Sequence, residues 1–62
     1  MEPPTYREVI RLLLRDGFSE RASAGDHRRF SKGPYKVTVR DAGGDHPSWK
    51  EWQSIQRQAG WK

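Results

Sequence analysis

The hydrophobic positions near the start of the chain recur at helical spacing. Thr5 and Glu8 form the pattern of a capping box, in which each side chain accepts a hydrogen bond from the other residue's amide. A helix should therefore begin after Thr5. The apolar residues of its buried face are Tyr6, Val9, Ile10, Leu13 and Leu14. Asp16 and Gly17 suit a helix end, so we predict a helix of about 12 residues packed on an apolar surface.

From residue 18 onward the period of the pattern changes to two, which is typical of strands. Residues 18–24 predict a weak or edge strand. The residues expected on one side of this strand are Phe18, Glu20, Ala22 and Ala24. After a turn at Gly25 and Asp26, residues 27–31 predict a second strand, with Phe30 as its best core anchor. Alternation places His27 and Arg29 on one face, and Arg28 and Phe30 on the other.

The clearest strand follows a hairpin connection at residues 32–34. Its alternating apolar residues are Tyr35, Val37 and Val39, and we expect Tyr35 to be partly buried. Three short strands in succession predict an antiparallel meander. Residues 41–47 are rich in Gly and Asp and predict a loop.

A second helix is predicted after Ser48, where Ser48 and Glu51 repeat the capping-box pattern and Gly60 is placed to end the helix. Its apolar face comprises Trp49, Trp52, Ile55, Gln56 and Ala59, and we interpret the two tryptophans as core residues. The predicted order is α-β-β-β-α. Two amphipathic helices can both bury their apolar stripes on one face of a three-stranded antiparallel sheet, which leaves the other face in water. The predicted fold class is therefore α+β.

Length and composition limit the alternatives. A chain of 62 residues allows one domain, residues 1–62, and the absence of cysteine removes disulfides and thiolate zinc sites. No apolar run approaches the roughly 18 residues of a membrane span, and the first residues lack the features of a signal peptide. We therefore expect a cytoplasmic protein that does not use a membrane.

Positive charge is concentrated in the middle of the chain. Between residues 21 and 40 there are six basic residues and one acidic residue, whereas the rest of the chain is close to neutral. A concentration of this kind is typical of a surface that binds a polyanion such as a nucleic acid, although a solvated basic face is the simpler explanation.

The chemistry open to the chain is narrow. Two histidines without cysteines make a zinc site improbable, and no Gly-rich phosphate loop is present, so we expect no metal and no cofactor. His27 follows a Gly turn in the basic segment, where an imidazole can exchange protons with RNA, which carries its own nucleophile in the 2′-hydroxyl. Alternatively, His27 only helps an arginine to hold phosphate. His46 is interpreted as an exposed loop residue.

Four segments taken together resemble the HicA toxins of bacterial HicAB toxin-antitoxin modules. They are LRDGF at 14–18, GDHRRF at 25–30, VTV at 37–39 and IQRQAG at 55–60. The resemblance implies an mRNA interferase with a double-stranded-RNA-binding-domain-like fold, neutralised by a HicB antitoxin that covers its site. The Gly-x-His motif of the family falls on Gly25, Asp26 and His27, which implies that His27 is catalytic.

The chain departs from the family pattern at three places. Asp26 replaces a small residue, Arg28 stands where many members have a second histidine, and Arg40 replaces a proline after Val39. A carboxylate beside His27 could orient the ring or repel phosphate.

The resulting hypothesis is metal-independent cleavage of mRNA, with His27 as general base on the 2′-hydroxyl or as general acid on the leaving oxygen. The residues expected to bind the RNA are Arg28, Arg29, Lys36 and Arg40. A non-catalytic RNA-binding module is the alternative, and a domain that chiefly docks an acidic protein is a third reading.

Overall fold

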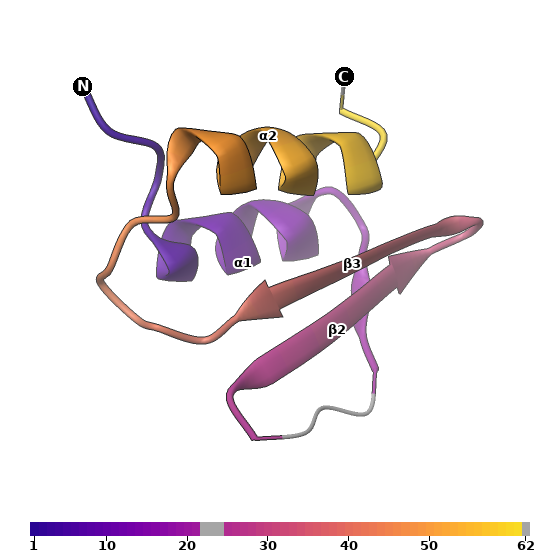
Figure 1. Cartoon of the computed structure of the whole chain (residues 1–62). Helices are drawn as coiled ribbons and strands as arrows, with labels where there is room; N and C mark the ends of the chain where they lie inside the picture. Colours follow the sequence, from indigo (N-terminus) through magenta and orange to yellow (C-terminus); the bar gives the residue numbers. More distant parts are fainter. Residues whose placement is uncertain (22–24, 62) are drawn as a thin grey trace.

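A computed structural model describes residues 1–21 and 25–61 of the chain (Figure 1). Its elements are α1 (Tyr6–Arg15), β1 (Ser19–Glu20), β2 (His27–Lys32), β3 (Tyr35–Arg40) and α2 (Trp49–Gln58). This order confirms the predicted α-β-β-β-α arrangement and the α+β class, in the topology of a double-stranded-RNA-binding domain. The three strands form one antiparallel sheet in the order β1-β2-β3.

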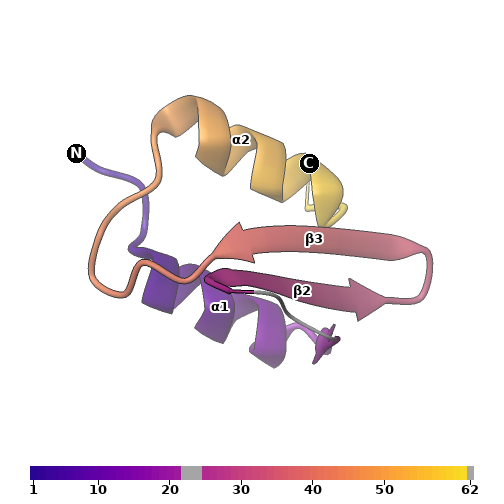
Figure 2. The ribbon, with the colours of Figure 1, turned by 60° about the horizontal axis from the view of Figure 1, so that its bottom comes forward.

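Both helices lie over the same face of the sheet. Figure 1 shows α1 and α2 on the same side of the sheet, and in Figures 1 and 2 their N-terminal ends lie at the same end of the molecule. The core between the helices and the sheet comprises Tyr6, Val9, Ile10, Leu13, Phe18, Phe30, Val37, Val39, Ile55 and Ala59. Because these side chains fill one face of the sheet, its other face is left to the polar residues of the strands.

The N-terminus of α1 is capped as the sequence predicts. The Thr5 Oγ1 accepts from the Glu8 amide at 3.1 Å, and the Glu8 carboxylate accepts from the Thr5 amide at 2.8 Å. Two further amides of this turn, those of Tyr6 and Arg7, donate to backbone carbonyls of Asp45 and Gly43. Since helix ends otherwise leave such donors without partners, these bonds also fasten the 41–48 loop to α1.

The prediction of the buried face of α1 is wrong for one residue, Leu14. Leu14 is 50% exposed, although Tyr6 and Leu13 are buried as expected. The chain leaves the helix after Arg15, and Phe18 supplies the next core side chain, its amide donating to the Leu13 carbonyl. Leu14 therefore lies beyond the edge of the buried face.

The first strand is shorter than predicted. β1 has two residues, paired as Ser19 with Ser31 and Glu20 with Phe30. One further backbone bond, from the Arg21 amide to the Arg29 carbonyl, continues the pairing. The predicted positions of Ala22 and Ala24 lie outside the described residues.

The second helix also departs from prediction at its first turn. Ser48 caps the Glu51 amide, but the Glu51 carboxylate accepts from the Tyr6 hydroxyl, so the predicted reciprocal capping box is replaced by a bond to α1. Trp49 is 51% exposed rather than buried. The buried residues of this segment are Ile55 and Ala59, in its C-terminal half, and Trp52 packs on the core as a partly buried side chain. Trp49 therefore projects into water, whereas Glu51 of the same turn contacts α1.

The end of α2 explains the environment of Tyr35. Gly60 has φ of +75°, and a Cβ at this position would lie 2.6 Å from Cε1 of Tyr35. Only glycine allows both the left-handed backbone and this close approach. The Tyr35 ring lies against the end of the helix and stays 46% exposed, which is more than predicted.

Candidate functional site

The open face of the sheet is built by the alternation of β2 and β3. Phe30 pairs with Val37, and both side chains are buried under the helices. The residues on either side of them in each strand therefore point to the opposite, open face. In register, the open-face pairs are His27 with Arg40, Arg29 with Thr38, and Ser31 with Lys36. The predicted division of β2 into a core face and a polar face is confirmed.

His27 is the first residue of β2 and is freely accessible. Its side chain is 63% exposed, and Nδ1 lies 3.4 Å from Oδ1 of Asp26. The turn that carries Asp26 is held to the end of β3, because the Asp26 carbonyl accepts from the Asp41 amide at 2.6 Å. The carboxylate faces one ring nitrogen, which leaves Nε2 to meet an incoming ligand.

A hollow of about 480 Å³ lies on the open face toward the β2–β3 hairpin. It is lined by Arg21, Arg29, Phe30, Ser31, Gly33, Lys36, Val37 and Thr38. Three of these residues are basic and two carry hydroxyls. The Arg21 Nε donates to the Ser31 Oγ at 2.7 Å, which lays this arginine across β2.

Arg21 is a residue that the sequence analysis did not single out. In the sequence, Arg21 is only one of the six basic residues between positions 21 and 40. The signal that could have found it is register: opposite Arg29, it falls on the open face of the sheet. Without the pairing of β1 with β2, nothing in the sequence distinguishes Arg21 from the other basic residues.

Arg28 points to the helix side and is held by acidic residues. Its guanidinium makes two bonds to the Glu20 carboxylate, at 2.8 and 2.6 Å, and lies 3.6 Å from an Asp41 oxygen. It also lies 5.7 Å from the centre of the Phe30 ring. The bond to Glu20 raises the pKa of Arg28 above its ordinary value. The charge of this arginine is thus largely compensated within the fold.

Arg40 lies at the end of β3 and turns away from its open-face position. Its guanidinium is 5.7 Å from the centre of the Tyr6 ring, near the N-terminus of α1. The four predicted RNA-binding residues therefore separate into two groups. Arg29 and Lys36 line the hollow, whereas Arg28 and Arg40 have their guanidinium groups at the helix side of the sheet.

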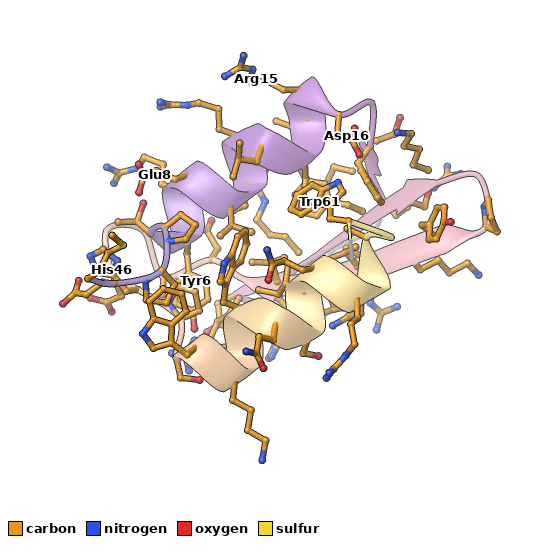
Figure 3. All side chains as sticks on the ribbon, turned by 90° about the horizontal axis from the view of Figure 1, so that it is seen from above. Tyr6, Glu8, Arg15, Asp16, His46 and Trp61 are labelled. Atoms are coloured by element: carbon orange, nitrogen blue, oxygen red, sulfur yellow. The ribbon has the colours of Figure 1, made fainter. Side chains whose placement is uncertain are left out.

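His46 holds the N-terminal segment against the 41–48 loop. Its Nδ1 lies 2.6 Å from the Pro3 carbonyl and its Nε2 lies 2.8 Å from a Glu2 carboxylate oxygen. Both neighbours are hydrogen-bond acceptors and come from the N-terminal segment. In Figure 3, His46 lies near Tyr6 and Glu8, at the start of α1. His46 is an exposed loop residue, as predicted, and it also connects two segments of the chain.

The opposite end of the helix layer carries a second polar contact. The Trp61 indole Nε1 donates to Oδ2 of Asp16 at 2.9 Å, and the Lys32 ammonium lies 3.2 Å from the same oxygen (Figure 3). These two donors lower the pKa of Asp16 below its ordinary value. The contact attaches the end of the chain to the end of α1.

The described residues form neither a metal-binding cluster nor a membrane-spanning helix. Within residues 1–21 and 25–61, no group of three or more His, Asp or Glu side chains could hold a metal ion. In the same part of the chain, no helix is long and apolar enough to cross a membrane.

The fold and the face define a small α+β domain with the topology of a double-stranded-RNA-binding domain and with a basic open sheet face that carries an exposed histidine. A family model described as "HicA toxin of bacterial toxin-antitoxin" matches residues 6–61. The chain therefore belongs to the HicA toxin family, and a toxin of this kind has an antitoxin as its partner. Among curated proteins, none matches the sequence.

Proposed function

We propose that this toxin is an endoribonuclease that cleaves mRNA in the bacterial cytoplasm without a metal ion, with His27 as its catalytic residue. The observation that carries the proposal is the position of His27. An exposed imidazole stands on the open sheet face, with Nδ1 toward Asp26 and with the basic hollow further along the same strand. The family of the chain supports the toxin role.

The proposed reaction uses the nucleophile that RNA supplies. The 2′-oxygen bonds to the adjacent phosphorus, its proton is removed, and the bond from phosphorus to the 5′-oxygen breaks. The products are a 2′,3′-cyclic phosphate and a 5′-hydroxyl that has gained a proton. His27 acts either as the base that takes the proton of the 2′-hydroxyl or as the acid that supplies a proton to the 5′-oxygen. Because the site is exposed, water accepts or supplies the proton that His27 does not transfer.

The basic residues of the face bind phosphates that neighbour the reacting one. Arg29 and Lys36 lie on the open face and offer charge-assisted hydrogen bonds to phosphate oxygens. Arg40 reaches the same strand of RNA only if its guanidinium leaves the Tyr6 ring. We assign Arg28 to the fold, because both of its bonds to Glu20 would have to break before it could bind phosphate.

The decisive experiment compares the toxin with its His27→Ala variant in cells and in vitro. The parent should arrest growth and fragment mRNA, and the variant should do neither while retaining most of its RNA affinity. Cleavage should persist in EDTA. Loss of cleavage in EDTA that Mg²⁺ restores would refute the metal-independent mechanism. A His27→Ala variant that still cleaves would remove His27 from the chemistry, and a parent that binds RNA without cleaving would favour the RNA-binding module.

The two roles of His27 can be separated with a modified substrate. In an RNA whose bridging 5′-oxygen is replaced by sulfur, the leaving group departs without a proton. If His27 is the general acid, His27→Ala should cleave this substrate nearly as fast as the parent does. If His27 is the general base, the variant should remain slow on both substrates.

We further propose that the partner is a HicB-like antitoxin that covers the open face. Arg21, Arg29 and Lys36 present a basic surface, which an acidic partner would complement. Complex formation should then slow as the salt concentration rises, and a bound antitoxin should exclude RNA. A ternary complex of toxin, antitoxin and RNA would show that the antitoxin binds elsewhere.

A further inference from the structure

The hollow on the open face has the character of a binding site separate from His27. Its basic side chains come from all three strand segments of the sheet. Arg21 directly follows β1, Arg29 lies on β2 and Lys36 lies on β3. The hydroxyls of Ser31 and Thr38 lie between them. A volume of about 480 Å³ lies within the range of pockets that bind small molecules.

The hollow lies too far from His27 to hold the phosphate that is cleaved. Successive residues of an antiparallel strand advance by about 3.4 Å, which places Arg29 about 7 Å and Ser31 about 14 Å from His27 along β2. A proton-transferring residue must come within about 2.6–3.2 Å of its target. A phosphate bound at Ser31 and its strand partner Lys36 is therefore a different one from the phosphate at His27.

We infer that this hollow binds a neighbouring nucleotide of a single-stranded RNA and so sets where along the strand His27 acts. The inference rests on the proposed ribonuclease function. Arg21, Arg29 and Lys36 bind the phosphate of that nucleotide, and the hydroxyls of Ser31 and Thr38 offer hydrogen bonds to its sugar or base. RNA then lies along β2, from the hairpin toward His27.

The shape of the site selects single-stranded RNA. A nucleotide in a duplex is stacked and paired. To enter a hollow in a sheet it would have to leave its neighbours, which costs the free energy of stacking and base pairing. The nucleotides of a single strand can be splayed outward one at a time. The helix layer, which is the other face of this fold, takes no part in this contact.

Binding can be tested without cleavage. The probe is a fluorescein-labelled RNA 12-mer pool of random sequence, 2′-O-methylated throughout so that no 2′-hydroxyl can attack, and the protein is the His27→Ala variant. In this background, Lys36→Gln should weaken binding about tenfold, as expected for the loss of a charged hydrogen-bond donor. The dependence of log affinity on log salt should also flatten by about 0.7.

The matched control is Lys50→Gln. Lys50 is exposed on α2, on the helix side of the molecule, and its loss changes the net charge by the same amount. This variant should bind the pool as the His27→Ala background does. Equal weakening by Lys36→Gln and Lys50→Gln would overturn the inference, because the contact would then be a general effect of charge. Equal affinity for a duplex of the same RNA would overturn it too.

The outcome is independent of catalysis. If the parent protein fails to cleave any RNA while Lys36→Gln still weakens binding and Lys50→Gln does not, the nucleotide site stands and the proposed reaction fails. If the parent cleaves RNA but Lys36→Gln changes neither binding nor KM, the reaction stands and the nucleotide site fails. Thermal melting of each variant verifies that the fold is intact.

Discussion

The Tyr6 hydroxyl donates a 2.6 Å hydrogen bond to Oε1 of Glu51 and thereby joins the first turns of α1 and α2. The Tyr6 ring is 2% exposed, and the Arg40 guanidinium lies beside it. This one phenol therefore links both helices to the end of β3. Burial, followed by the bond to Glu51, raises the pKa of Tyr6 above its ordinary value of 10.0.

Tyr6→Phe should lower the free energy of unfolding by about 1–2 kcal/mol, because the Glu51 carboxylate loses a donor. The raised pKa also sets a pH dependence. The neutral phenol stabilises the fold fully below the unfolded pKa, and this contribution is lost as the pH rises through the higher folded pKa. Urea denaturation at increasing alkaline pH should show a steeper loss for the parent than for Tyr6→Phe. Parallel profiles would show that Tyr6 does not control alkaline stability.

The adjacent arginines of β2 should respond in opposite ways to substitution. Arg28→Gln removes the ion pair with Glu20. Both side chains of this pair are about one third exposed, so the substitution should lower the free energy of unfolding by about 1 kcal/mol. It should leave RNA affinity nearly unchanged. Arg29→Gln should weaken RNA binding about tenfold and leave stability unchanged, because this residue lies on the open face. Denaturation and fluorescence binding on the same two proteins measure both effects. A larger loss of RNA affinity for Arg28→Gln would return that residue to the binding surface.

Asp26→Asn should separate the positioning of His27 from the repulsion of phosphate. The carboxylate lies 3.4 Å from the His27 Nδ1, so its neutralisation should lower kcat roughly tenfold, a fraction of what general acid-base catalysis contributes. KM should fall at the same time, because a negative charge beside the phosphate is removed. Steady-state kinetics on one RNA substrate provide both values. An unchanged kcat would show that Asp26 does not orient the ring.

The contact between Asp16 and Trp61 should break in acid. Asp16 has a lowered pKa because it accepts from the Trp61 indole and lies beside Lys32. Its contribution is therefore present above the unfolded pKa and is lost as the pH falls through the lower folded pKa. The assigned Trp61 indole proton in an NMR titration should shift in that range, below the ordinary carboxyl pKa of 3.8. Asp16→Asn serves as the control, and a titration of Trp61 that persists in this variant would implicate another group.

The sequence predicts the strands and their faces well because period two is a strong local signal. Phe30, Val37 and Val39 are buried as expected, and His27 and Arg29 point away from them. The capping box of Thr5 is also a local pattern and is confirmed. The family resemblance placed the fold correctly, and the match to residues 6–61 supports the toxin role.

The errors share a physical origin in contacts between distant residues. Helical periodicity assigns Leu14 and Trp49 to an apolar face, but it does not reveal where the surface beneath that face ends. Arg28 is drawn to Glu20, eight residues earlier, by a strand pairing too short to predict. The Glu51 carboxylate accepts from the Tyr6 hydroxyl, 45 residues away in the sequence, instead of from the amide of its own N-cap.

The division of β2 into a buried face and an open face has a consequence for the evolution of the toxin. His27 is exposed and lies on the sheet face opposite the core, so a mutation that removes its imidazole leaves the packing of Phe30 intact. Such a copy would remain folded and would still present the rest of the face to an antitoxin. Under the proposed function such a copy would no longer cleave RNA, and its product would act as a decoy that competes with active toxin for the antitoxin.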